Sequence, residues 1–70
     1  MIIFEDIMAM LLENGWTSYR LRKEKIFSES TLTRIRNQEP ITTVTIEKIC
    51  DLCDCQPGEL MHYTRTEHDE

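Results

Sequence analysis

Six of the eight basic residues in this 70-residue chain lie between Arg20 and Arg36, which makes this stretch its strongest charge feature. Residues 17–40 carry six bases and three acids, a balance of +3, whereas the whole chain carries −5. A local concentration of Lys and Arg is what a polyanion such as nucleic acid binds, whatever the net charge of the chain. A solvated helix face gives the same pattern, so charge alone leaves both interpretations open.

A second group of residues could bind a metal ion by residue type. It consists of Cys50, Cys53 and Cys55, followed by His62 and His68. Thiolate sulfur and imidazole nitrogen are the ligands of zinc, which takes four of them. The spacing Cys-x-x-Cys-x-Cys differs from that of common zinc fingers, and the first two cysteines fall on the apolar stripe of an expected helix. A free thiol there packs as a small hydrophobe. We therefore expect reduced core thiols, with no metal and no cofactor.

Length and composition bound the kind of protein. Seventy residues make one domain at most, and 40% hydrophobic with 30% charged residues is typical of a globular chain. The longest unbroken apolar run, Ile7 to Leu12, is far shorter than the roughly 20 residues of a membrane span. The N-terminus lacks the basic region of a signal peptide. We expect a cytoplasmic protein with no membrane contact, no small-molecule ligand and no enzymatic activity.

The spacing of apolar residues predicts an all-α fold, a compact five-helix bundle. We expect its helices over residues 3–14, 18–25, 29–37, 44–54 and 57–63. The β-branched stretch from Thr42 to Ile46 has no second strand to pair with, so no strand is expected. Residues 1–63 then form the single domain, and residues 64–70, which contain no apolar side chain, form a flexible tail.

The expected helices have local start and stop signals. Gly15 suits the end of the first helix, because glycine adopts the left-handed conformation freely. Thr17, Ser28 and Thr43 suit the N-caps of the next three, since a hydroxyl can accept a hydrogen bond from a first-turn amide. The side chains expected to point inward are Ile3, Ile7, Met10, Leu11, Asn14, Tyr19, Leu21, Thr31, Leu32, Ile35, Ile46, Ile49, Cys50, Cys53, Leu60, Met61 and Tyr63.

Residues 17–37 have the layout of a helix-turn-helix, with two short helices, a tight turn and a polar face on the second helix. The DNA major groove, about 12 Å wide, admits one such helix, whose N-terminal residues reach the base edges. Arginine can bond a guanine edge with two hydrogen bonds, and Ser or Thr hydroxyls can bond several edges. Any small helical bundle also has polar faces, so a plain bundle surface stays open as the alternative.

Residues 19–63, YRLRKEKIFSESTLTRIRNQEPITTVTIEKICDLCDCQPGELMHY, resemble the Cro and phage-repressor type of helix-turn-helix domain, the XRE family. With the first helix included, the resemblance covers Phe4 to Tyr63. The segment from Ile49 to Leu60 is similar to a bacterial branch with the pattern I-C-x-x-L-x-C-x-P-G-[DE]-L, although Cys53 replaces its usual leucine. Members are small five-helix DNA-binding regulators that commonly act as dimers.

The resemblance implies a double-stranded DNA operator as the partner and a homodimer that associates through residues 55–63 or the first helix. It places the helix over residues 29–37 in the major groove of DNA, as in a transcriptional repressor. It implies base-edge contacts by Glu29, Ser30, Thr33 and Arg34, and phosphate contacts by Thr17, Ser18, Lys23, Ser28, Arg36, Asn37 and Gln38.

Three residues depart from the family pattern. Arg22 stands where a small residue is usual, Ile26 occupies the place of the turn glycine, and Glu29 replaces a neutral residue. A β-branched residue is poor at positive φ, and a carboxylate repels phosphates. Together with the seven acids after Ile41, these departures motivate an alternative of another class, a protein-interaction module such as an anti-repressor or an antitoxin.

Overall fold

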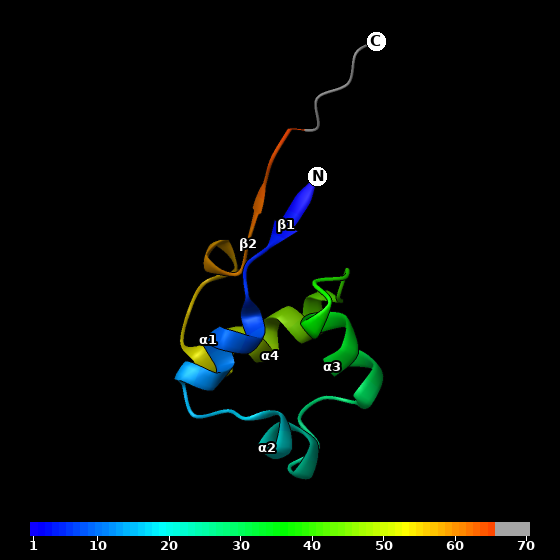
Figure 1. Ribbon diagram of the computed structural model, residues 1–70. Coiled ribbons are helices and arrows are strands. Elements are labelled where there is room, and N and C mark those ends of the chain that lie inside the picture. The colour runs from blue at the N-terminus through cyan, green and yellow to red at the C-terminus, as the bar shows by residue number, and fades with distance from the viewer. Residues whose placement is uncertain (66–70) are drawn as a thin grey trace.

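The computed structural model describes residues 1–65, which contain four α-helices, a short 3-10 helix and a two-stranded sheet. Figure 1 shows the helices gathered into one body, with the two strands standing out from it as a ribbon at one end. No helix among these residues is long and apolar enough to cross a membrane. In chain order the elements are β1 (Ile2–Phe4), α1 (Ile7–Glu13), α2 (Ser18–Lys23), α3 (Glu29–Arg36), α4 (Thr43–Cys53), η1 (Pro57–Glu59) and β2 (Met61–Tyr63).

The fold is mostly helical, as expected, but four α-helices and a small sheet replace the expected five helices without strands. β1 pairs antiparallel with β2, with Ile2 opposite Tyr63 and Phe4 opposite Met61. The first helix therefore begins at Ile7 instead of residue 3, and the fifth expected helix is reduced to η1. The partner of each strand lies about sixty residues away along the chain, so a local pattern search finds no partner for either.

The core is built by the inner faces of the helices, closed by Leu60 just before β2. Tyr19 and Tyr63 were expected to point inward, but their exposed fractions are 66% and 69%. Ile3, expected on the first helix, lies on β1 at 36% exposure. A tyrosine has an apolar ring and a polar tip, so a pattern of apolar types overstates its burial. The buried side chains are Ile7, Leu11, Leu21, Phe27, Leu32, Ile35, Ile49 and Leu60.

Each α-helix is preceded by a residue whose side-chain hydroxyl or carboxylate accepts a hydrogen bond from a first-turn amide. The expected caps of α2 and α3 are confirmed, because the backbone N–H of Arg20 donates to Thr17 Oγ1 at 3.1 Å and that of Thr31 to Ser28 Oγ at 3.2 Å. The expected cap of α4 was wrong by one residue: Thr42 is the cap, and its hydroxyl accepts from Thr45. Two adjacent threonines offer the same hydroxyl, so the sequence does not choose between them.

Each α-helix is followed by a left-handed residue. Gly15, with φ +85°, ends α1 as expected. Lys25, Gln38 and Asp54 take the same conformation after α2, α3 and α4, with φ between 52° and 59°. The amide of the residue after the left-handed one then bonds back into the helix, as Trp16 does to the Leu11 carbonyl at 2.8 Å. These bonds satisfy carbonyls that would otherwise lack partners at the helix ends.

Candidate nucleic-acid interface

The turn between α2 and α3 accommodates Ile26 without placing it at positive φ. The left-handed residue is Lys25, one position earlier. The Lys25 amide bonds to the Arg22 carbonyl at 3.0 Å, and the Ile26 amide bonds to the Leu21 carbonyl at 3.0 Å. This is the paired hydrogen-bond pattern that ends many helices. The β-branched side chain therefore does not disrupt the turn, and it packs half-buried against the core.

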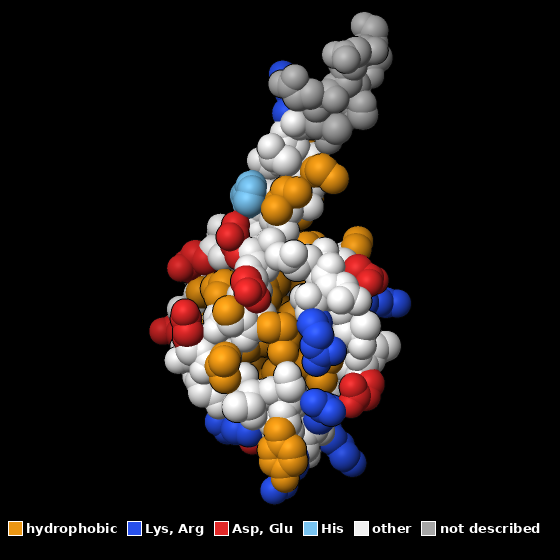
Figure 2. Space-filling view, viewed as in Figure 1, with side chains coloured by type: hydrophobic (Ala, Val, Ile, Leu, Met, Phe, Trp, Pro, Cys, Tyr) orange, Lys and Arg blue, Asp and Glu red, His pale blue; other side chains and the backbone are white. Residues whose placement is uncertain are grey.

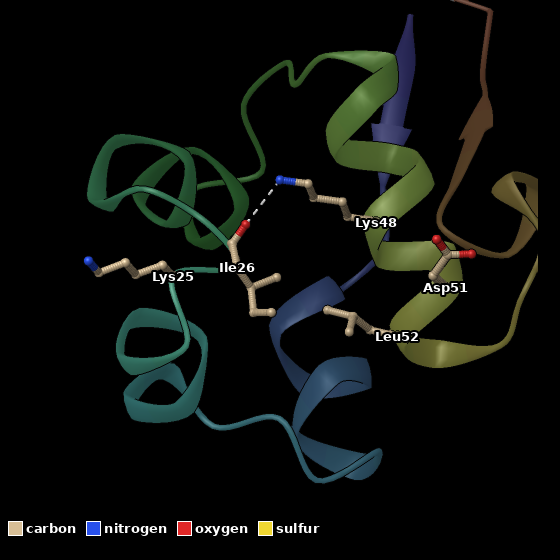
Figure 3. A pocket seen from close by; sticks show the side chains of 5 residues that line it. All are labelled: Lys25, Ile26, Lys48, Asp51 and Leu52. Carbon is tan, nitrogen blue, oxygen red and sulfur yellow. Dashed lines mark hydrogen bonds between the residues drawn. The ribbon is translucent and has the colours of Figure 1, made fainter.

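A lysine from α4 holds the turn from the other side. Lys48 Nζ donates to the Ile26 carbonyl at 3.3 Å, the contact drawn as a dashed line in Figure 3. The same ammonium lies 6.0 Å from the ring centroid of Phe27, a distance that permits a cation–π interaction. Lys25 points away from this contact in Figure 3. α4 thus fixes the point at which the chain enters α3.

α3 divides cleanly into a buried face and an exposed face. Leu32 and Ile35 point into the core, with exposed fractions of 0% and 3%. The four residues expected to reach base edges, which share one side of the helix by its period of 3.6 residues, are all exposed. The structure therefore brings together the predicted base-reading set of Glu29, Ser30, Thr33 and Arg34.

The hydroxyls near the start of α3 are already linked to one another. Ser28 Oγ lies 3.0 Å from Thr31 Oγ1 and 3.1 Å from Ser30 Oγ. Thr33 Oγ1 donates to the Glu29 carbonyl at 3.0 Å, which engages its hydroxyl hydrogen within the helix. Thr33 therefore presents an acceptor oxygen and a methyl group to a ligand, a combination that suits apolar contact with a thymine methyl.

Glu29 does not stand alone at the start of α3, because Arg22 lies beside it. Arg22 Nε is 3.4 Å from Glu29 Oε2, and the two side chains are 49% and 69% exposed. Such an exposed pair adds little stability. Its consequence is electrostatic, since the guanidinium offsets the carboxylate where a polyanion would approach. Two of the three departures from the family pattern are thus partners of each other, a contact that the sequence interpretation missed.

The remaining cations of this surface differ in how firmly they are held. Arg34 and Arg36 are exposed, and within residues 1–65 neither has an ion-pair partner within 4 Å. Lys23 lies over the Tyr19 ring at 5.5 Å. Arg20, in contrast, is anchored by Glu24 Oε2 at 3.1 Å and by the Trp16 ring at 4.1 Å.

Besides the capping hydroxyls of Thr17 and Ser28, two amide side chains of the predicted phosphate-contacting set are engaged inside the molecule. Gln38 Nε2 donates to the Phe4 carbonyl at 2.9 Å, which ties the end of α3 to β1. Asn37 Nδ2 donates to Glu39 Oε2 at 3.3 Å. At the start of α2, Thr17 is exposed and Ser18 is half-buried. The predicted phosphate-contacting residues therefore lie at the two ends of α3 and along α2, with Gln38 turned toward the ribbon.

Charge is distributed unevenly over the molecule. In Figure 2 acidic side chains gather on the left over α1 and the base of the ribbon, and basic ones gather below and on the right, over α2 and α3. The sequence agrees, because residues 1–16 carry three acids and no base while residues 17–40 carry +3. The basic side is the one that carries the exposed face of α3.

The cysteines lie away from this basic side, at the end of α4. Cys50, Cys53 and Cys55 are half-buried free thiols. Burial and the neighbouring Cys50 thiol raise the pKa of Cys53, and the same causes raise the pKa of Cys55 to about 11. Within residues 1–65, no three His, Cys, Asp or Glu side chains are grouped so as to hold a metal ion. His68 and most of the expected tail lie outside the described residues.

Comparison with known proteins gives one positive result. Residues 6–65 match the family model of the Cro/C1-type HTH DNA-binding domain. No curated protein and no solved structure matches the chain. The matched span includes all four α-helices and ends just after β2.

Proposed function

Since the chain belongs to the Cro/C1-type helix-turn-helix DNA-binding family, we propose that it is a sequence-specific regulator of transcription that binds double-stranded DNA. The observation that carries this proposal is the exposed polar face of α3, set on a helix whose other face is fully packed. We propose repression as its mode, because a domain of this size can block a promoter by occupying it. The proposal includes no catalytic activity and no cofactor.

In the proposed complex, α3 lies in the major groove with its N-terminal half against the base edges. An α-helix with its side chains is about 10–12 Å in diameter, which fits a groove about 12 Å wide, and the eight residues of α3 run about 12 Å along it. Arg34 can bond guanine with two hydrogen bonds, and its guanidinium has no ion-pair partner within residues 1–65 to release first. The Thr33 methyl can contact thymine. Together they specify only a few base pairs.

Phosphate contacts then fix the orientation of α3 on the duplex. Lys23 and Arg36 are exposed cations at the ends of the two helices, and Thr17, Ser18 and Ser28 offer hydroxyls near their N-termini. Such contacts supply affinity without sequence information. The Arg22–Glu29 pair lets α3 approach DNA although its first residue is acidic.

We further propose a homodimer on a two-fold symmetric operator, because one α3 reads too few base pairs for useful specificity. The proposed setting is the cytoplasm of a bacterium or of a cell infected by a phage, where such an operator is accessible. The similarity of residues 49–60 to the pattern that ends in P-G-[DE]-L supports assignment to that bacterial branch.

The first test is fluorescence anisotropy of labelled random duplex DNA, titrated with the protein at 50 mM and 200 mM salt. Binding through several phosphates releases counterions, so we expect affinity to fall steeply with salt. Operator selection from a random duplex pool then follows. No binding at the lower salt concentration would contradict DNA binding and favour the protein-interaction alternative, which a pull-down of a partner would test.

A pair of substitutions separates base reading from phosphate binding. On the selected operator, Arg34→Ala should cost about 1–3 kcal/mol of binding free energy and relax one base position. Lys23→Ala should weaken all sequences alike and reduce the salt slope by about one. Equal losses on operator and random DNA for both variants would contradict the assignment of α3 as the reading helix.

A further inference from the structure

The end of α4 brings two thiols together. Asp54, with φ 52°, turns the chain back after the helix, and the Cys55 amide then donates to the Cys50 carbonyl at 3.1 Å. This is the long hydrogen bond of the Schellman motif, in which the side chains at its two ends frequently contact each other. Here those side chains belong to Cys50 and Cys55, which are both half-buried free thiols. The helix end therefore pairs two groups that can react with each other.

The same hydrogen bond limits how far apart the two Cα atoms can lie. A Cα is about 1.5 Å from its own amide nitrogen and about 2.4 Å from its carbonyl oxygen. With the 3.1 Å bond between them, the Cα atoms of Cys50 and Cys55 lie within about 7 Å of each other. That is the upper limit for a disulfide without backbone movement. Burial and then the neighbouring Cys50 thiol, by its charge and by side-chain contact, raise the pKa of Cys55 to about 11, so the two sulfur atoms are neighbours.

Both thiols line one surface hollow, and the third cysteine does not. The hollow, of about 400 Å³, lies between the last turns of α4 and the start of η1, and its wall includes Cys50 and Cys55 but not Cys53. An oxidant that enters it therefore meets this pair first. Three exposed carboxylates also line the hollow, those of Glu47, Asp51 and Asp54. They repel an anionic oxidant such as glutathione disulfide, whereas neutral hydrogen peroxide can enter.

We propose that Cys50 and Cys55 form a reversible disulfide when the protein meets hydrogen peroxide, and that this bond fastens the end of α4 to the segment that leads into the ribbon. That segment is short, because one residue separates Cys55 from η1, which runs directly to β2 at the foot of the ribbon (Figure 1). In a reducing compartment such a disulfide is transient, because glutathione and thioredoxin reduce it again. Formation of the bond does not depend on DNA.

The bond forms in a two-electron oxidation with hydrogen peroxide as the electron acceptor. One thiolate attacks a peroxide oxygen, the O–O bond breaks, and the sulfur becomes a sulfenic acid while one water leaves. The second thiol attacks that sulfur, which forms the S–S bond and releases a second water, so both thiol protons end in water. Because the pKa of Cys55 is about 11, its thiol is almost entirely neutral at pH 7, and the bond should form faster at pH 9 than at pH 7.

The first test maps the bond in the parent chain. Asp51 and Asp54 separate the three cysteines, so cleavage on the amino side of aspartate places each cysteine in its own peptide. The folded protein is treated with millimolar hydrogen peroxide, free thiols are blocked with iodoacetamide, and the digest is analysed by mass spectrometry without reduction. The peptides that carry Cys50 and Cys55 should be joined, and the peptide of Cys53 should be alkylated. Dithiothreitol should release the link.

The second test measures what the bond does to the fold. Closing even a short loop restricts the unfolded chain, so oxidation should raise the urea midpoint by roughly 1 M or more. Cys53→Ser should show the same rise, whereas Cys55→Ser, treated identically, should show none. The Cys55→Ser variant also controls for methionine oxidation, because peroxide forms methionine sulfoxide in it as in the parent chain. Dithiothreitol should reverse the rise in the parent chain.

Four results would overturn the proposed disulfide: a link from Cys53 to either of the other cysteines, links only between separate copies of the chain, a urea midpoint that oxidation leaves unchanged, or an equal rise in Cys55→Ser. Faster bond formation with glutathione disulfide than with hydrogen peroxide at equal concentration would contradict the assignment of the oxidant. The peptide map needs no variant, so it decides the pairing even where a substituted chain fails to fold. None of these measurements uses DNA, so their failure leaves the proposed function standing.

Discussion

The α2–α3 half of the molecule and the β1–β2 ribbon differ in how completely they bury their apolar side chains. α2 and α3 bury Leu21 and Leu32 completely and turn polar side chains outward. The ribbon exposes half or more of Ile2 and Tyr63 and is held to the body by its half-buried base. A single chain therefore completes the first region and leaves the second without cover. The difference is that α3 displays polar side chains on a finished core, whereas the ribbon displays apolar side chains that residues 1–65 do not cover.

The largest expected effect separates the two regions by stability. Leu32→Ala should lower the free energy of unfolding by about 3 kcal/mol, because it leaves a cavity beneath α3. Ile2→Ala, measured on the monomer by urea denaturation, should cost about 0.5 kcal/mol or less. Similar losses in the two variants would contradict the contrast between a packed reading helix and an uncovered ribbon.

Substitutions at the left-handed residues that follow the helices give the next-largest changes in stability, one a gain and one a loss. Lys25→Gly should stabilise the monomer by about 0.5–1 kcal/mol, because glycine carries no Cβ penalty at positive φ. Gly15→Ala should destabilise it by about 1 kcal/mol, since φ is +85° there although the nearest atom, on Arg20, leaves space at 3.9 Å. Thermal unfolding of both variants gives the comparison. A loss of stability in Lys25→Gly would show that its side chain has a structural role in the turn.

A smaller effect on stability is expected at alkaline pH, from the thiol of Cys55. Burial raises the pKa of Cys55 from 9.0 to about 11 in the folded chain. The folded state therefore keeps the full contribution of the neutral thiol below pH 9 and loses it as the pH rises toward 11. The urea midpoint of the parent chain should fall more steeply from pH 9 to 11 than that of Cys55→Ala. Parallel curves would contradict the raised pKa.

The smallest effect on stability is expected at the DNA side. Glu29→Gln breaks an exposed ion pair and should change the free energy of unfolding by less than about 0.5 kcal/mol. The same substitution releases Arg22 from its partner and removes a negative charge, so affinity for random duplex DNA should rise. Glu24→Gln, which frees Arg20 on the same helix, is the matched control. An equal rise in both variants would indicate a general charge effect.

Much of the helical body could be predicted because its signals are local. Thr17 and Ser28 predict helix starts, because their hydroxyls can cap the first turn. The spacing of Leu32 and Ile35 identifies the inner face of α3. The ribbon could not be predicted in the same way. Its strands have three residues each and pair across the whole chain, so their pairing depends on the fold of everything between them and leaves no local signal.

For the candidate site, the sequence predicts which residues share a face but not which side chains engage one another. Helical periodicity places Ser30, Thr33 and Arg34 together, as the structure has them. The Arg22–Glu29 pair joins two helices across a turn, and its only sequence signal is that two unusual residues carry opposite charges. The contact of Gln38 with β1 has no local signal, because it depends on where the N-terminal strand lies.

The hydrogen bond from Gln38 to the Phe4 carbonyl has a consequence for the architecture of an operator. It ties β1, at the base of the ribbon, to the residue that follows α3, so the ribbon and α3 are held in a fixed relative direction. In the proposed homodimer, the separation of the two α3 helices would set the half-site spacing of the operators that the protein can bind. Inserting five base pairs at the operator centre would turn one half-site to the opposite side of the double helix, out of reach of the second α3.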